Sequence, residues 1–128
     1  MKKFQNTLSE CLASFWTNYT DWGRATRAEY WWAVSFYFVI APIIVLMPIM
    51  FFVEAIISPL AAFFVEEVFY LSMATPMFCL TARRLDDTNR SNWNMLWIFV
   101  PIVGVIMLIV YLCQQGDQKT NNFGEPRI

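Results

Sequence analysis

The chain has 128 residues, of which 58% are hydrophobic and 15% are charged, whereas an ordinary soluble domain has about 45–50% apolar and about 25% charged residues. Nine Lys and Arg residues against ten Asp and Glu residues leave a net charge of -1, which argues against a nucleic-acid-binding protein, and the high hydrophobicity excludes intrinsic disorder. The composition predicts a small membrane protein, with room for three or four spans of roughly 20 residues each and none for a separate catalytic domain.

The residue types needed for most catalytic and metal sites are missing. Histidine is absent, which removes the commonest general base and the commonest metal ligand. The cysteines at 11, 79 and 113 have no paired spacing, so they predict no disulfide framework. The start of the chain lacks the apolar core and cleavage site of a signal peptide. We therefore expect a non-enzymatic protein without metal or cofactor.

Residues 1–22 are predicted to form an amphipathic helix. Between Phe4 and Tyr19 the large apolar and aromatic side chains recur every three or four residues, which is the spacing of one helical face. With Lys2 and Lys3 near anionic headgroups, this helix would lie in the plane of the membrane interface. The alternative is a helix packed on another protein surface.

Three apolar segments follow, so the expected fold is an all-α membrane protein with about three transmembrane helices. Residues 30–53 carry no charge before Glu54, and at about 1.5 Å per residue they reach roughly 36 Å, enough to cross a hydrocarbon core of about 30 Å. Aromatic residues at the ends of these segments indicate that the ends lie at the membrane interfaces, and prolines within the segments predict kinks. The predicted parts of this single membrane domain are span 1 at 30–53, an interfacial or partly re-entrant connection at 55–63, span 2 at 64–82, span 3 at 93–113 and a polar, irregular tail at 114–128.

The basic residues predict the orientation. Seven of the nine lie before span 1 or between spans 2 and 3, so the positive-inside rule places both segments and the N-terminus in the cytoplasm. Three spans would send the tail to the opposite side of the membrane. A fourth, hidden crossing or a re-entrant third segment would return it to the cytoplasm.

Eight of the nineteen charged residues lie in two short segments, 24–29 and 83–90. Their guanidinium groups can pair with the neighbouring carboxylates and fix the helix ends, or they can bind an anionic lipid or another phosphate-bearing ligand. The carboxylate pair at 86–87 is only a weak match to a magnesium–diphosphate site, because no second acidic motif accompanies it. The candidate site consists of Arg24, Arg27, Glu29, Arg83, Arg84, Asp86, Asp87, Arg90, Ser91 and Trp93.

Glu66 and Glu67 form a second candidate site near the start of span 2. Ionisable groups inside a bilayer are costly and are often functional, so the pair could act as a proton or cation relay. The alternative is that both carboxylates mark the outer end of the span and reach water.

The charged segments also carry a family resemblance. The patterns are Gly23-Arg24-x-x-Arg27-x-Glu29-Tyr30-Trp31, Arg83-Arg84-Leu85-x-Asp87-Thr88-x-x-Ser91-x-Trp93, Pro101-x-x-Gly104 and Asn122-Phe123-Gly124. Together they resemble the small bacterial inner-membrane proteins of the YhaH/YhaI type, domain-of-unknown-function family 805 (DUF805). The resemblance implies a multi-pass protein of the bacterial inner (cytoplasmic) membrane without an established activity. This sequence departs from the family pattern at Asp86, where histidine is usual.

We therefore predict an integral membrane protein with a structural or interaction role, in which the charged cluster holds the helices together or binds an anionic lipid or a partner. The expected partners are membrane lipids, another copy of the chain or another envelope protein, and no nucleic acid. One alternative is a small oligomeric transporter or lipid-handling protein, and another is an accessory or protective subunit of an envelope protein.

Overall fold

The computed structural model describes residues 8–17 and 23–126, and within these ranges it is helical apart from turns and one isolated antiparallel bridge between Asn121 and Gly124. The helical fold class is confirmed for this part of the chain. The elements in chain order are α1 (Leu8–Thr17), α2 (Arg27–Ser35), the π-helical turns η1 (Phe36–Ile40) and η2 (Pro42–Leu46), α3 (Met47–Ile56), α4 (Pro59–Asp87), the 3₁₀ helix η3 (Asn92–Phe99) and α5 (Val103–Cys113).

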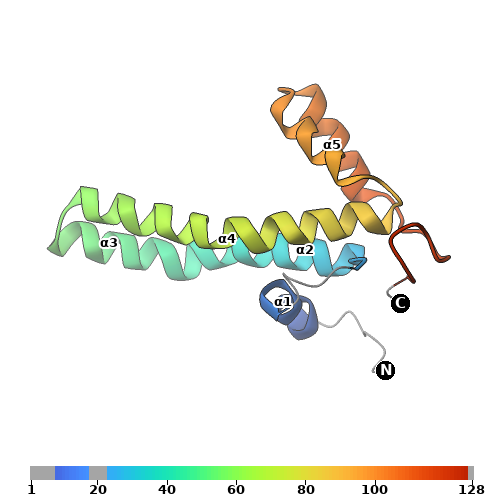
Figure 1. Ribbon diagram of the computed structural model, residues 1–128. Helices are drawn as coiled ribbons and strands as arrows, with labels where there is room; N and C mark the ends of the chain where they lie inside the picture. Colours follow the sequence, from blue (N-terminus) through green and yellow to red (C-terminus); the bar gives the residue numbers. More distant parts are fainter. Residues whose placement is uncertain (1–7, 18–22, 127–128) are drawn as a thin grey trace.

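Two long helices lie side by side and antiparallel (Figure 1). The first is continuous from α2 through α3 over 30 residues, the second is α4 with 29 residues, and both are long and apolar enough to cross a membrane. The predicted spans 30–53 and 64–82 lie within them. The connection predicted at 55–63 is wrong in its extent, because only Ile57 and Ser58 lie outside the helices. The Ser58 hydroxyl caps α4 by accepting a hydrogen bond from the Ala61 amide at 3.2 Å.

Proline affects the two long helices differently. Around Pro42 the first helix changes to π-helical hydrogen bonding, in which the Ala41 amide donates to the Phe36 carbonyl and the Met47 amide to the Pro42 carbonyl. The wider turn accommodates a residue that has no amide hydrogen to donate. In contrast, α4 continues through Pro76 without a break.

Helix α1 packs against the first long helix. Its inward face buries Cys11, Ser14 and Phe15, and the Phe15 ring stacks on Tyr37 with centroids 4.4 Å apart. The Tyr37 hydroxyl also donates to the Leu12 carbonyl at 3.2 Å. The apolar face of α1 therefore packs on the first long helix of the same chain. The periodicity predicted an apolar face but did not identify the surface that it contacts. Residues 1–7 and 18–22 of the prediction lie outside the described residues.

The segment predicted as span 3, residues 93–113, is not one helix. It divides into η3 and α5 at residues 100–102, because Pro101 cannot continue the hydrogen-bond ladder and Ile102 adopts a left-handed φ of 63°. Helix α5 has 11 residues, which reach roughly 16 Å, about half of a hydrocarbon core. One continuous third span is therefore not confirmed.

Both ends of this third segment lie near the C-terminal end of α4. The Arg90 guanidinium, just before η3, lies 3.8 Å from the ring centroid of Tyr111 near the end of α5. It also donates from Nη2 to the Gln114 side-chain oxygen at 3.0 Å. The segment thus leaves the end of α4 and returns to it, and α5 diverges obliquely from the two long helices (Figure 1).

Buried and exposed apolar side chains are unevenly distributed. The core includes Phe15, Tyr30, Leu85 and Leu112, and it lies where α1, α2, α4 and α5 meet. Along the rest of the two long helices large apolar side chains are exposed, such as Phe51 in α3 at 77% and Leu71 in α4 at 75%. Soluble monomers rarely expose continuous surfaces of this kind. The exposed surface of the two long helices therefore fits contact with lipid.

Candidate functional site

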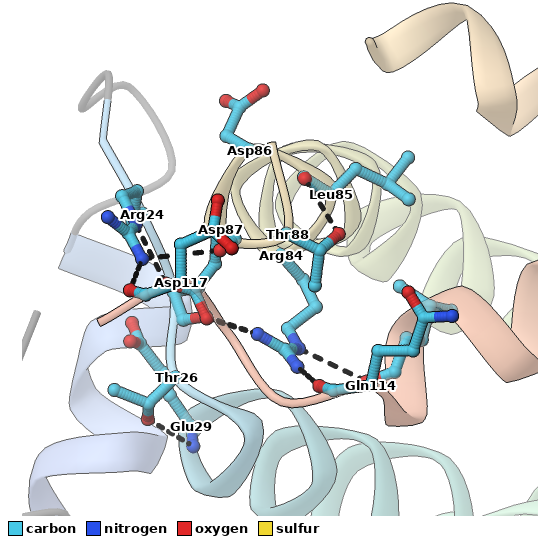
Figure 2. A network of polar contacts seen from close by, with 12 residues as sticks. Arg24, Thr26, Glu29, Arg84, Leu85, Asp86, Asp87, Thr88, Gln114 and Asp117 are labelled. Atoms are coloured by element: carbon cyan, nitrogen blue, oxygen red, sulfur yellow. Dashed lines mark hydrogen bonds and ion pairs between the residues drawn. The ribbon is translucent and has the colours of Figure 1, made fainter. Parts of the chain in front are cut away.

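Four segments that are distant in sequence meet at the C-terminal end of α4: residues 23–26 before α2, α4 itself, the end of α5 and the tail (Figure 2). The Ala25 amide donates to the Arg83 carbonyl at 3.0 Å, and the Asp117 amide donates to the Asp87 carbonyl at 2.9 Å. Asn89, with a left-handed φ of 53°, ends α4 and reverses the chain, so that the Arg90 amide donates to the Leu85 carbonyl at 3.0 Å.

Arg24 connects the segment before α2 to α4 and to the tail. Its buried side chain donates from Nε to Asp87 Oδ1 at 2.8 Å and from Nη2 to the Asp87 carbonyl at 3.2 Å. The same guanidinium donates to three tail carbonyls, those of Asp117, Lys119 and Gly124. One side chain thus holds the tail against the end of α4.

Arg84 has an equivalent role toward α5. Its fully buried side chain pairs with the second carboxylate oxygen of Asp87. Its other N–H groups donate to the carbonyls of Ala25 at 3.3 Å and Leu112 at 3.1 Å, and to that of Gln114. Asp87 therefore bridges two buried arginines. We call Arg24, Arg84, Asp87 and these carbonyl acceptors the Asp87 network.

Glu29 organises a second group of contacts, between α1, α2 and α4. Its buried carboxylate accepts from Ser14 Oγ at 2.6 Å and from Arg83 Nη2 at 3.1 Å. Its backbone amide donates to the Thr26 hydroxyl, which caps α2. The first turn of α2 is thereby fixed to α1 through Ser14 and to α4 through Arg83.

The remaining predicted residues lie outside these two groups. Asp86 points away from the Asp87 network (Figure 2), although its carbonyl accepts from the Asn121 amide group at 2.9 Å. Ser91 caps η3, and Trp93 is 78% exposed. Arg27 is exposed, and it has no ion pair within residues 8–17 and 23–126.

Glu66 and Glu67 lie far from the cluster, about 20 residues and roughly 30 Å up α4. Glu66 is half-buried and Glu67 is exposed. In the part of the chain that the structure describes, neither carboxylate has an ion-pair partner and no group of three or more metal-ligating side chains is present. The structure brings neither glutamate to the charged cluster.

Sequence reasoning missed the contribution of the tail. Asp117, Lys119 and Gly124 take part through their carbonyl groups, which side-chain patterns do not indicate. Gly116 passes so close to Asp87 that a Cβ atom there would overlap the carboxylate. The sequence signals in this part of the chain were the motif at 122–124 and the turn at 115–117, and neither indicated contacts with Arg24.

We expect Gly116→Ala to destabilise the protein by about 1–3 kcal/mol, because the added methyl group forces apart a packed contact. The midpoint of thermal unfolding in detergent micelles measures this loss. Gln115→Ala, at the adjacent exposed position, serves as the control and should leave the midpoint unchanged. Equal midpoints for the two variants would contradict the close contact between Gly116 and Asp87.

Comparisons with known proteins agree on one family. Residues 19–125 match the family model described as "Protein of unknown function (DUF805)". The chain is 31% identical over 102 residues to the inner membrane protein YhaI of Escherichia coli (strain K12), covering 80% of each chain. It is 29% identical over 115 residues to the inner membrane protein YhaH of the same strain, covering 83% of this chain and 86% of that one. No solved structure matches the chain.

Proposed function

The chain belongs to the DUF805 family, and on that premise we propose that it is a non-enzymatic integral membrane protein whose Asp87 network holds its cytoplasmic end together. The role is structural: the network gives the membrane-spanning pair of helices, the third segment and the tail one fixed arrangement, which can serve as a platform for other envelope components.

The proposal includes a specific topology. The two long helices cross the membrane, whereas η3 and α5 enter it and return to the same side. The hydrogen bond from the Asp117 amide in the tail to the Asp87 carbonyl at the end of α4 supports a tail on the same side as that end. The positive-inside rule then places the arginine-rich end, the N-terminal segment and the tail together in the cytoplasm.

One observation carries the structural role. The guanidinium groups of Arg24 and Arg84 share the Asp87 carboxylate and direct their other donors to backbone carbonyls of the chain itself. An arginine in a phosphate site must leave its fork of N–H donors open to the ligand. This arrangement therefore favours internal fixation over ligand binding at these two residues.

Tryptic cleavage after Lys119 tests this role, because the carbonyl of that peptide bond accepts from Arg24 Nη1 at 2.8 Å. We expect Arg24→Gln to accelerate this cleavage at least tenfold, since hydrogen bonds from charged groups are worth about 1.5–3 kcal/mol. Intact-mass measurement of the purified protein in detergent micelles follows the loss of the tail.

Arg27→Gln provides the matched control, because it makes the same substitution at an exposed arginine outside the network. Its cleavage rate should equal that of the wild type. Circular dichroism should give the same helix content for all three proteins, so that local release of the tail is distinguished from unfolding. An unchanged rate in Arg24→Gln would overturn the proposed role.

A further inference from the structure

The arginines of the candidate site differ in what they contact. Arg24, Arg83 and Arg84 each pair with a carboxylate, and Arg90 is covered by the Tyr111 ring and bonded to Gln114. Arg27 alone among the five is exposed, and its guanidinium has neither a carboxylate nor a hydrogen-bond partner within residues 8–17 and 23–126. Its fork of donors is therefore open to an external ligand.

Arg27 lies at a groove between α2 and the end of α5. The groove has a volume of about 540 Å³ and is lined by Arg27, Ala28, Trp31, Trp32, Ser35 and Cys113. Apart from Arg27 its lining carries no charge. Trp31 and Trp32, one turn from Arg27 along α2, are the residue type that prefers the depth of lipid headgroups.

The electrostatics around the groove favour an anion. Five arginines and three carboxylates give the charged cluster a net charge of +2. Glu29, in the same turn of α2, does not offset Arg27, because its buried carboxylate is bonded to Ser14 and Arg83. The amide groups in the first turn of α2 add partial positive charge.

We infer that this groove binds the headgroup of an anionic phospholipid, with the phosphate on the Arg27 guanidinium and an acyl chain following α2 past Ser35. A planar guanidinium suits phosphate oxygens, and the aromatic, otherwise uncharged lining suits the glycerol and upper acyl region of a lipid. The inference rests on the membrane placement of the proposed function, but it does not depend on the Asp87 network.

Native mass spectrometry of the full-length protein, with phosphatidylglycerol or phosphatidylcholine added to the micelles, tests the site. We expect the wild type to bind phosphatidylglycerol with higher affinity than phosphatidylcholine, and Arg27→Gln to weaken phosphatidylglycerol binding about tenfold, as expected for loss of a charge-assisted hydrogen bond. Phosphatidylcholine binding should change little. An unchanged affinity for phosphatidylglycerol in Arg27→Gln would overturn the inference.

Lys119→Gln is the matched control, because it removes the same charge from an exposed tail residue that contacts Arg24 through its backbone carbonyl, which the substitution retains. It should retain the affinity for phosphatidylglycerol, and an equal loss in both variants would show general charge attraction instead of a site. Displacement of the lipid by inorganic phosphate would assign the site to a free anion and contradict the lipid. Arg27→Gln should leave tryptic cleavage after residue 119 unaltered. The loss of lipid binding is thereby distinguished from a failure of the Asp87 network.

Discussion

Replacing Asp87 with asparagine should lower the free energy of unfolding by about 3–5 kcal/mol, because the change leaves two buried arginines without their shared counter-charge. The side chains of Arg24 and Arg84 are both fully buried at this carboxylate, so water cannot replace it. For a chain of this size the loss corresponds to a fall of about 10–20 °C in the midpoint of thermal unfolding, which fluorescence of the purified protein in detergent micelles can measure.

The neighbouring carboxylate offers a matched control for this substitution. Asp86 directs its side chain away from the two arginines (Figure 2), and none of the described ion pairs includes it. We expect Asp86→Asn to change the midpoint by only a few degrees. Similar losses at residues 86 and 87 would mean that stability depends on total negative charge and would contradict the specific role of Asp87.

Arg84→Lys should destabilise the protein by about 2–4 kcal/mol even though the charge is retained. A lysine ammonium group is a point charge with three donors, and it cannot reproduce the planar fork of arginine. It can keep one contact with Asp87, but it cannot at the same time reach the carbonyls of Leu112 and Gln114 that fix the end of α5. Buried carbonyls that lose their donors account for the cost.

The corresponding control is Arg27→Lys, which makes the same exchange at an exposed arginine outside the Asp87 network. Its midpoint of thermal unfolding should match that of the wild type. The midpoints of the two variants should therefore differ clearly, and a wild-type midpoint for Arg84→Lys would show that charge alone, without the fork of donors, is sufficient.

The sequence was sufficient to predict the two long apolar helices and to direct attention to the segments 24–29 and 83–90, between which the structure forms ion pairs. The uncharged run at 30–53 and the apolar run before Arg83 both predict long apolar helices, because a membrane span requires about 20 apolar residues in succession. Arginine and aspartate in two short segments similarly indicated a site, because charge is scarce elsewhere in the chain.

The course of the third segment could not be predicted in the same way. A run of 21 uncharged residues at 93–113 satisfies hydropathy both as one span and as two short helices. The structure contains two short helices, η3 and α5, in which Gly104 packs so closely on the Trp97 carbonyl that a Cβ atom there would overlap it. Pro101 and Gly104 indicated bending, but not a reversal of direction.

The pairing within the cluster was also beyond sequence reasoning. Asp86 and Asp87 are adjacent and chemically identical, yet Asp87 is the one that pairs with Arg24 and Arg84. Which of two neighbouring helical side chains points inward depends on the rotation of α4 against α2 and α5. The tail acceptors are backbone groups, so their role follows from the fold and not from residue type.

The side of the membrane on which the C-terminus lies shows whether the tail is held at the arginine-rich end of α4. Green fluorescent protein and alkaline phosphatase, each fused after Ile128 and produced in Escherichia coli, report cytoplasmic and periplasmic locations respectively. A tail held at the arginine-rich end predicts a fluorescent fusion and an inactive phosphatase. An active phosphatase with no fluorescence would place the tail across the membrane from Arg24 and Asp87, and it would contradict the account.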